Sequence, residues 1–374
     1  MNEHRILVVD AITDASPIVP YLVRELSCLA DIFCFKIPFL LKHSYYQNWF
    51  EVLSSDILFF INQLKHHLEN HHYDWVIVGN DATLRILNKY ISDDALAQKI
   101  FPLSDLTNRV MLGSKAGLSL VCKRHNIRTP GFTIFDAAKT VTEMLQDLSY
   151  PVLLKVDESS GGRGVFLCKQ ESNVKEALKQ IKEKEKENLL FQNYIKGKLI
   201  SVEAIYKKGV LLGYLYSTVT KTVSHEFSVS RERVFSDTTL IEEELHHIGS
   251  SLGINGFATM TFIYDDETKQ YFFIECDLRP QTWFLLGKFA GLNFSQVIKN
   301  YFSDAASVLK ISLNPGESER VLWHFFRDLR NCVVEKNMSN LWKWCINKKK
   351  CWRLIPWYGF RGLSRSLYFS FRKR

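Results

Sequence analysis

The sequence lacks several features that would place it in a specialised class. No apolar run reaches the roughly 20 residues of a transmembrane helix, and the apolar stretch within Met1–Asp10 is too short for a signal peptide. The eight cysteines form no CxxC pair, so reduced thiols are expected rather than disulfides or a zinc site. These absences favour a cytoplasmic protein. A chain of 374 residues that is 46% hydrophobic has room for two or three domains.

Two common catalytic motifs are absent as well. His67 and His71 are four residues apart and could share a helix face, but Glu69 is out of place for an HExxH zinc motif, so we expect a solvated helix end. The glycine-rich stretch 159–164 is followed by a strand pattern rather than by Gly-Lys-Ser/Thr and a helix. It is therefore neither a P-loop nor a dinucleotide fingerprint.

Acidic residues are almost missing from the C-terminal segment. Residues 331–374 hold eleven Lys and Arg against one acid, Glu335, so this segment carries +10 and the rest of the chain sums to −2. Residues 339–374 interleave the basic side chains with Trp, Tyr and Phe. That mixture suits contact with an anionic membrane surface, or a helical subdomain packed on the core. Stacking on nucleic acid is the least favoured of the three.

The most informative stretch that is present runs from Pro151 to Leu167. Residues 152–156 are an apolar strand pattern interrupted by Lys155, and a lysine on a buried strand usually has an anionic partner. Residues 159–164 then form a polar, glycine-rich turn before the strand pattern resumes. Backbone N–H groups of such a turn approach a ligand closely, and a nearby ammonium offsets charge. The pattern therefore favours a turn that binds a polyphosphate. The alternative is an ordinary flexible hairpin with no ligand.

An acidic strand end lies further along the chain. Glu275 and Asp277 are two residues apart on a predicted strand, so both side chains point to one face. Two adjacent carboxylates repel each other unless a cation lies between them. Mg²⁺ prefers such hard oxygen ligands, particularly when phosphates supply the others.

These features, in this order, resemble the ATP-grasp superfamily over roughly residues 110–300. Ser114-Lys115 opens a predicted helix that is followed by Asn126-Ile127-Arg128-Thr129-Pro130, and residues 189–198 match the family's hinge. Phe272–Trp283 resembles the family phrase E-x-N-x-R, with Asp277 in place of Asn and Arg279 matching the arginine. The resemblance implies two α+β subdomains that clamp ATP, and activation of a carboxylate as an acyl phosphate that an amine or another nucleophile then attacks.

The resemblance also implies roles for individual residues. Lys115 and Lys155 are expected to bind ATP phosphates, the hinge (residues 192–195) to read adenine through free backbone groups, and Glu275 and Asp277 to bind Mg²⁺. Arg279 is expected to stabilise the transferring phosphoryl group, with Lys155 and Arg233 as further catalytic groups. The expected ATP-binding set is Lys115, Lys155, Ser160, Gly161, Gly162, Arg163, Gly164, Gln192, Asn193, Tyr194, Ile195 and Glu203.

Three positions depart from the family pattern. Members often carry Glu where this chain has Asn193 and Lys198, so Glu203 is the expected substitute for the ribose contact. On the strand facing Glu275, an acid is usual where this chain has Thr261. Asp277 restores the number of carboxylates expected in the metal-binding set, which favours a catalytically active enzyme over a pseudoenzyme.

The remaining segments complete the expected fold, which is α/β and α+β. Residues 1–110 alternate strands and helices, which predicts a parallel sheet. Polar residues at its strand ends are candidates for the second substrate or for helix caps: Asp10, Thr13, Asp14, Asn80, Asp81 and Thr83. Residues 111–190 and 191–310 are the expected ATP-grasp subdomains, and 311–374 a basic extension. The polar stretch 221–235 is a further substrate candidate, with Lys221, His225, Arg231 and Arg233.

The sequence therefore predicts an ATP- and Mg²⁺-dependent carboxylate–amine ligase. Its partners would be ATP, a small carboxylate and an amine, with peripheral membrane contact through residues 339–374 as an additional expectation. A non-catalytic ATP-binding adaptor is the alternative. A carboxylase or carbamoyl-phosphate-type enzyme that uses bicarbonate is less favoured, because neither a biotin-carrier segment nor a second ATP-grasp copy is visible.

Overall fold

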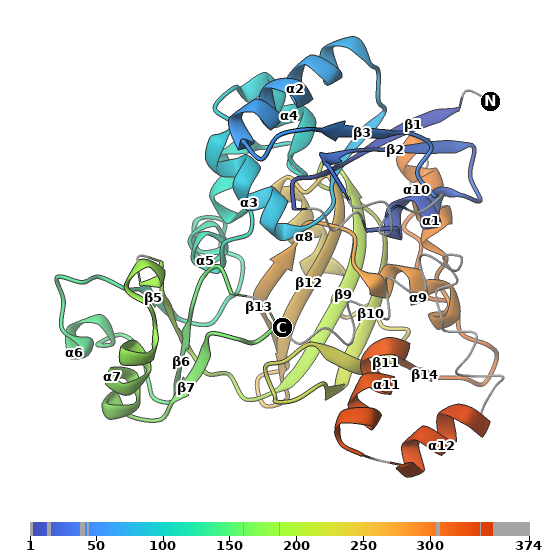
Figure 1. The fold of residues 1–374 in the computed structure, drawn as a ribbon. Coiled ribbons are helices and arrows are strands. Elements are labelled where there is room, and N and C mark those ends of the chain that lie inside the picture. Colours follow the sequence, from blue (N-terminus) through green and yellow to red (C-terminus); the bar gives the residue numbers. More distant parts are fainter. Residues whose placement is uncertain are drawn as a thin grey trace.

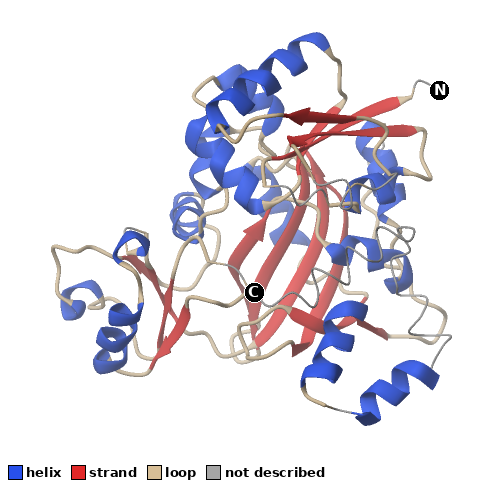
Figure 2. Cartoon of the chain, in the orientation of Figure 1, coloured by secondary structure: helices blue, strands red, loops and turns tan. Residues whose placement is uncertain are grey.

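The computed structural model describes residues 3–12, 16–37, 42, 45–159, 161–186, 188–303, 307–336 and 338–346. Within these residues the chain forms three sheets with flanking helices (Figure 1). Figure 2 shows the largest sheet at the centre, with one smaller sheet above it and another to its left. The predicted fold class, α/β followed by α+β, is confirmed for the described residues.

The N-terminal unit is a parallel sheet in the order β3-β2-β1-β4. Its strands are β1 His4–Asp10, β2 Cys28–Phe35, β3 Trp49–Val52 and β4 Trp75–Val78. Its helices are α1 Ile18–Val23, α2 Ile57–Asn70, α3 Asp81–Tyr90 and α4 Asp94–Ile100. Helix α2 begins later than its apolar pattern suggests, because residues 49–52 pair with β2 and Asp56 then caps the helix by accepting a hydrogen bond from the Phe59 N–H.

The small sheet has the order β5-β8-β6-β7 and is antiparallel. Its strands are β5 Phe132–Ile134, β6 Val152–Lys155, β7 Val165–Cys168 and β8 Leu190–Asn193. Helices α6 Val141–Met144 and α7 Glu171–Gln180 cover it, and η3 Glu183–Glu185 leads into β8. Val152, Leu154 and Phe191 form its core with Val174 and Ala177 of α7, so the expected hairpin is present as β6 and β7.

The large antiparallel sheet has the order β13-β12-β9-β10-β11-β14. Its strands are β9 Lys198–Lys207, β10 Val210–Thr222, β11 Ser230–Ser236, β12 Gly256–Asp265, β13 Gln270–Asp277 and β14 Glu319–Trp323. Much of the polar stretch 221–235, a substrate candidate, is therefore strand. Strand β14 joins this sheet although it lies beyond residue 310, where the extension was expected to begin. The domain boundaries remain predictions.

The remaining helices connect these sheets. They are η2 Leu106–Met111, α5 Lys115–Arg124, α8 Glu242–Leu252, α9 Thr282–Ala290, α10 Phe294–Phe302, α11 Phe325–Val334 and α12 Met338–Ile346. Helix α5 lies between the small sheet and the N-terminal unit, whereas α9 and α10 lie on the other side of the large sheet (Figure 1). Ser295 of α10 donates a hydrogen bond to the carbonyl of Leu22 (2.6 Å), which ties the C-terminal helices to the N-terminal unit.

Candidate active site

Lys155 lies at the end of β6, where the small sheet faces the large one. Its side chain is buried, and Nζ donates a hydrogen bond to Oε1 of Gln192 on the neighbouring strand β8 (2.6 Å). Burial lowers the pKa of Lys155 to about 8, opposed by the carboxylate of Glu275 and reinforced by the ammonium of Lys115. Three predicted site residues from separate elements therefore act on one another electrostatically.

Lys115 is the first residue of α5 and is tied to the segment that follows β6. Its Nζ donates hydrogen bonds to the carbonyl oxygens of Asp157 and Ser159, both at 2.7 Å. Asp157 in turn accepts from the backbone N–H groups of Lys115 (2.5 Å) and Ala116 (3.0 Å) and from the hydroxyl of Ser114 (2.7 Å). Sequence reasoning missed Asp157, whose carboxylate caps α5 and joins it to the glycine-rich turn.

The glycine flap (residues 159–164) reaches across to the large sheet. Ser160 lies outside the described residues, and Arg163 is exposed. Gly162 has a φ of +76°, and a Cβ there would lie 2.0 Å from the carbonyl oxygen of Phe227 and 2.9 Å from His225. Both belong to the β10–β11 turn (residues 223–229), so the flap packs directly against this turn of the large sheet.

The hinge is where predicted, between the small and large sheets, but two of its groups are not free. The N–H of Asn193 donates to the carbonyl of Gly131 (2.8 Å), and the N–H of Tyr194 donates to that of Pro151 (3.1 Å). The Asn193 side chain accepts a hydrogen bond from the N–H of Ser149 (3.1 Å). Folding of the small subdomain therefore uses the N–H groups of Asn193 and Tyr194, and adenine recognition by the other backbone groups of residues 192–195 stays a prediction.

Glu275 and Asp277 lie on β13 with the geometry that their spacing predicts. Glu275 is exposed, and Thr261 of β12 is its partner in the ladder, with Ser201 of β9 beyond. Burial raises the pKa of Asp277 well above its usual range, and the carboxylates of Asp81 and Glu275 add to this effect. A divalent cation would relieve that repulsion, so the acids present fit Mg²⁺. Among the described residues, however, no three His, Cys, Asp or Glu side chains form a ready-made metal site.

Arg279 follows β13 and bridges a carboxylate of helix α3 and one of strand β13. Its Nη2 lies 2.5 Å from Oδ2 of Asp81 on α3 and 3.6 Å from Oδ2 of Asp277. Gln281 donates a hydrogen bond to the same Asp277 oxygen. The predicted arginine is therefore beside the acid pair, and the N-terminal unit contributes a carboxylate to the site.

Two predicted roles are contradicted by burial. Glu203 is fully buried and Arg233 is 5% exposed, and the two form an ion pair of 2.7 Å. The Arg233 guanidinium also lies 4.2 Å above the Trp283 ring, and its Nε donates to the hydroxyl of Ser230. Glu203 therefore cannot reach a ribose, and Arg233 is not an exposed catalytic group. The pair lies on the same face of the large sheet as the acid pair, because the ladder runs from Glu203 through Thr259 to Asp277.

The other second-substrate candidates have local partners. Lys221 pairs with Glu232 (2.6 Å), and Arg231 pairs with Asp328 of α11 (2.7 Å). Asn80 caps α3 by accepting from the N–H of Thr83. Thr13 and Asp14 lie outside the described residues.

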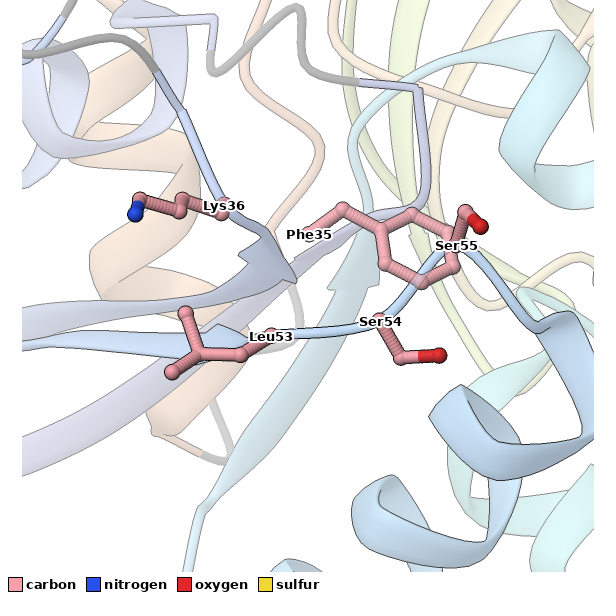
Figure 3. A pocket seen from close by; sticks show the side chains of 5 residues that line it. All are labelled: Phe35, Lys36, Leu53, Ser54 and Ser55. Atoms are coloured by element: carbon pink, nitrogen blue, oxygen red, sulfur yellow. The ribbon is translucent and has the colours of Figure 1, made fainter.

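A separate hollow of about 630 Å³ lies at the carboxyl ends of β2 and β3. Its lining residues are Phe35, Lys36, Leu53, Ser54 and Ser55 (Figure 3). The Lys36 side chain extends away from the two serine hydroxyls (Figure 3). The hollow thus lacks convergent polar groups and includes none of the predicted site residues.

Comparisons with known proteins agree with this geometry. A family model for the ATP-grasp domain matches residues 120–267. Carbamoyl-phosphate synthase of Methanobrevibacter smithii is 26% identical over 176 residues, which are 45% of this chain and 46% of that protein. The 2-oxoglutarate carboxylase small subunit of Hydrogenobacter thermophilus is 28% identical over 191 residues, 46% of this chain and 39% of that protein. The chain spans less than half the length of these curated relatives.

Solved structures share the fold over most of the chain. N5-carboxyaminoimidazole synthetase of Staphylococcus aureus, complexed with ADP, gives a TM-score of 0.66 at 14% identity, covering 90% of this chain and 86% of that one. L-amino acid ligase of Bacillus licheniformis gives 0.57 at 16% identity, covering 80% and 74%. The family match therefore identifies residues 120–267 as an ATP-grasp domain, and the solved structures show that most of the chain shares the fold of ATP-dependent enzymes of this kind.

Proposed function

We propose that this chain is an ATP-dependent carboxylate–amine ligase. A carboxylate oxygen of the substrate takes the γ-phosphoryl group and ADP leaves. The amine nitrogen then attacks the acyl carbon, phosphate leaves, and the nitrogen loses a proton to form the amide. The observation that supports this function best is that Lys115 of α5 is hydrogen-bonded to the segment that follows Lys155 on β6, while Glu275 of the large sheet acts electrostatically on Lys155.

The residues present suit the charge changes of that reaction. Lys155 and Lys115 would hold phosphate oxygens, and the amides of the glycine flap would cover them. Glu275 and Asp277 would hold Mg²⁺, which when bound offsets phosphate charge. Arg279 would face the phosphoryl group in transfer. Adenine would meet the remaining hinge groups around Ile195, since the N–H groups of Asn193 and Tyr194 are engaged.

Phosphate release from ATP tests this proposal. Purified protein would be assayed with pooled amino acids and carboxylates, and separately with bicarbonate and ammonium, because the relatives include a carboxylase and a carbamoyl-phosphate synthase. Substrate-stimulated release supports a ligase, and the pool that stimulates it identifies the acceptor class. ATP binding with no stimulated release in any pool would instead support the adaptor.

Two substitutions should abolish the release. Lys155→Ala removes a buried phosphate-facing cation, and Glu275→Gln removes a metal carboxylate, so each should lower the rate by at least about 100-fold. Lys169→Ala and Glu267→Gln are matched controls, because both residues are exposed on the same hairpins. Wild-type turnover in either test variant would show that the role assignment is wrong.

We also infer that the C-terminal segment contacts anionic membrane surfaces. None of the helices in the described residues combines the length and apolar character that crossing a bilayer needs, so the contact would be peripheral. Three apolar residues of helix α12 are largely exposed: Met338 at 62%, Trp342 at 62% and Ile346 at 71%. They are spaced four residues apart, so they lie on one face of the helix. From Lys336 to Arg374 the sequence holds eleven basic residues and no acid. Residues 347–374 themselves lie outside the described residues.

Vesicle sedimentation tests the membrane proposal. Binding to vesicles with 30% phosphatidylserine should exceed binding to phosphatidylcholine alone by about tenfold, and should fall in 0.5 M salt. Trp342→Ser with Met338→Ser should weaken it, whereas Leu240→Ser, which alters an apolar residue that is 76% exposed elsewhere, should not. Equal binding to both vesicle types, or a preference for single-stranded nucleic acid, would reject the proposal.

A further inference from the structure

Asp81 is the N-terminal unit's direct contribution to the ATP-grasp site. It is the first residue of α3, directly after the cap residue Asn80, and its carboxylate contacts Nη2 of Arg279 at 2.5 Å. Asp277, two residues before Arg279 on the same strand end, lies 3.6 Å from that nitrogen. The nearer of these two carboxylates therefore comes from a helix of the N-terminal unit, nearly 200 residues away in the sequence.

The backbone around Asp81 is fixed by a buried polar network. Asn80 Oδ1 accepts from the N–H of Thr83 (2.8 Å), and its Nδ2 donates to Oδ1 of Asp10 at the end of β1 (3.0 Å). Thr83 Oγ1 accepts from the N–H of Ala11 (2.9 Å). Asp10, Asn80 and Thr83 are all more than nine-tenths buried. The start of α3 is thus held to the ends of β1 and β4, and Asp81 has a rigid base.

The contact is partly shielded from water. The side chains of Arg279 and Asp81 are 24% and 22% exposed, so their attraction is screened less than that of a surface pair. An arginine side chain has several rotatable bonds, and holding it in one orientation removes an entropic cost from the step in which it acts. Asp81 and Asp277 both contact Nη2, so the fixed Asp81 carboxylate holds that nitrogen beside the strand end that carries Asp277.

We propose that Asp81 is a positioning residue for Arg279, so that the cation facing the transferring phosphoryl group is in place only when the N-terminal unit is docked on the large sheet. The role of Arg279 in this inference rests on the proposed function. The contact between Asp81 and Arg279 is independent of that function. A competing arrangement would have Asp81 block Arg279 until the substrate carboxylate displaces it. The two arrangements predict opposite effects when the charge of Asp81 is removed.

The test compares Asp81→Asn with Asp94→Asn. Both aspartates are the first residue of a helix, α3 and α4, so both changes remove the same favourable charge at a helix N-terminus. Asp94 is exposed and lies next to the cap residue Asp93. Asp81→Asn should lower substrate-stimulated phosphate release between about 10- and 100-fold while binding of the magnesium complex of AMP-PNP stays within about twofold. Asp94→Asn should change neither.

Two further measurements separate positioning from general damage. Asp81→Asn should cause little additional loss in an Arg279→Gln background, because a residue that acts through Arg279 has nothing left to position. Asp81→Glu should restore part of the rate. An unchanged or faster rate in Asp81→Asn would overturn the proposal, and a faster one would favour the blocking arrangement.

A spectroscopic measurement keeps this inference independent of the activity. The Nε–Hε signal of Arg279 in ¹⁵N-arginine spectra, assigned with Arg279→Lys, should shift in Asp81→Asn and not in Asp94→Asn. If wild-type protein releases no phosphate, the proposed function fails while the spectrum still reports on the contact. If the signal is identical in wild type and Asp81→Asn, the positioning role is rejected whatever the activity.

Discussion

At the scale of single residues, the site depends on an ammonium that the fold makes easier to deprotonate. Lys155 has a pKa of about 8, against an ordinary value of 10.5, because burial disfavours its charge more than Glu275 restores it. Between pH 8 and 10.5 the unfolded chain holds a proton that the folded protein has released. This group therefore costs stability at neutral pH, and that cost disappears as the pH rises through this window.

Nucleotide binding should show the opposite dependence. The triphosphate needs the ammonium form of Lys155, so affinity for the magnesium complex of AMP-PNP should fall as pH rises above about 8, and binding near pH 8 should take up protons. Calorimetry in two buffers with different ionisation enthalpies measures that uptake. The variant Lys155→Arg stays charged and should flatten the pH profile. Identical profiles for the two proteins would contradict the assigned role.

Burial also explains which single residues sequence reasoning misplaced. From the sequence, Glu203 is the expected substitute for the ribose contact and Arg233 a candidate from the polar stretch 221–235, but alternation along a strand reveals only the face on which a side chain lies. It does not reveal that Trp283 of α9 covers that face, 4.2 Å from the Arg233 guanidinium. The ion pair engages Oε1 of Glu203 and Nη1 of Arg233, and this structural use competes with ligand binding.

At the scale of elements, the glycine flap and the β10–β11 turn work as one closure. The flap requires glycine at 162 because the Phe227 carbonyl occupies the place of a Cβ. The same turn contacts the hinge, since the Tyr194 hydroxyl donates to Oε1 of Glu226 at 3.1 Å. The β10–β11 turn therefore contacts both the glycine flap and the hinge, the two elements that we propose bind the nucleotide.

Gly162→Ala should loosen this closure. The added methyl lies 2.0 Å from the Phe227 oxygen, so the flap or the turn must move, and affinity for the magnesium complex of AMP-PNP should fall roughly tenfold, equivalent to about 1.4 kcal/mol. Gly161→Ala is the matched control, because its φ of +65° is similar to the +76° of Gly162 but its Cβ would meet Val229 only at 3.6 Å. Equal losses in both variants would point to backbone strain rather than to the contact.

At the scale of the whole molecule, the N-terminal unit and the large sheet share continuous cores. Trp75 of β4 stacks on Phe257 of β12 (ring centroids 5.2 Å apart) and on Tyr301 of α10 (4.0 Å). Buried residues of β1 and β9 belong to the same hydrophobic clusters. By contrast, the small sheet has its own core. The N-terminal unit is thus built into the platform that carries the acids, which is what a positioning role for Asp81 requires.

The sequence by itself determined the elements and their chemistry. Local patterns were sufficient for the alternating N-terminal unit, the β6–β7 hairpin with Lys155, the helix that begins at Lys115, and the acid pair on β13. Each of these depends on residues adjacent in the chain, through strand alternation, glycine turns and helix caps. They do not need a distant partner to be recognised.

Only the tertiary structure decided which of those groups face one another. The Asp81–Arg279 contact, the Asp157 cap on α5, the burial of Glu203 with Arg233 and the hydrogen bonds that occupy the N–H groups of Asn193 and Tyr194 all join segments far apart in the sequence. Packing and backbone pairing settle such contacts, and a single sequence carries no periodic signal for them. For that reason the family could be inferred from local motifs, whereas the arrangement of charges around Arg279 required the folded chain.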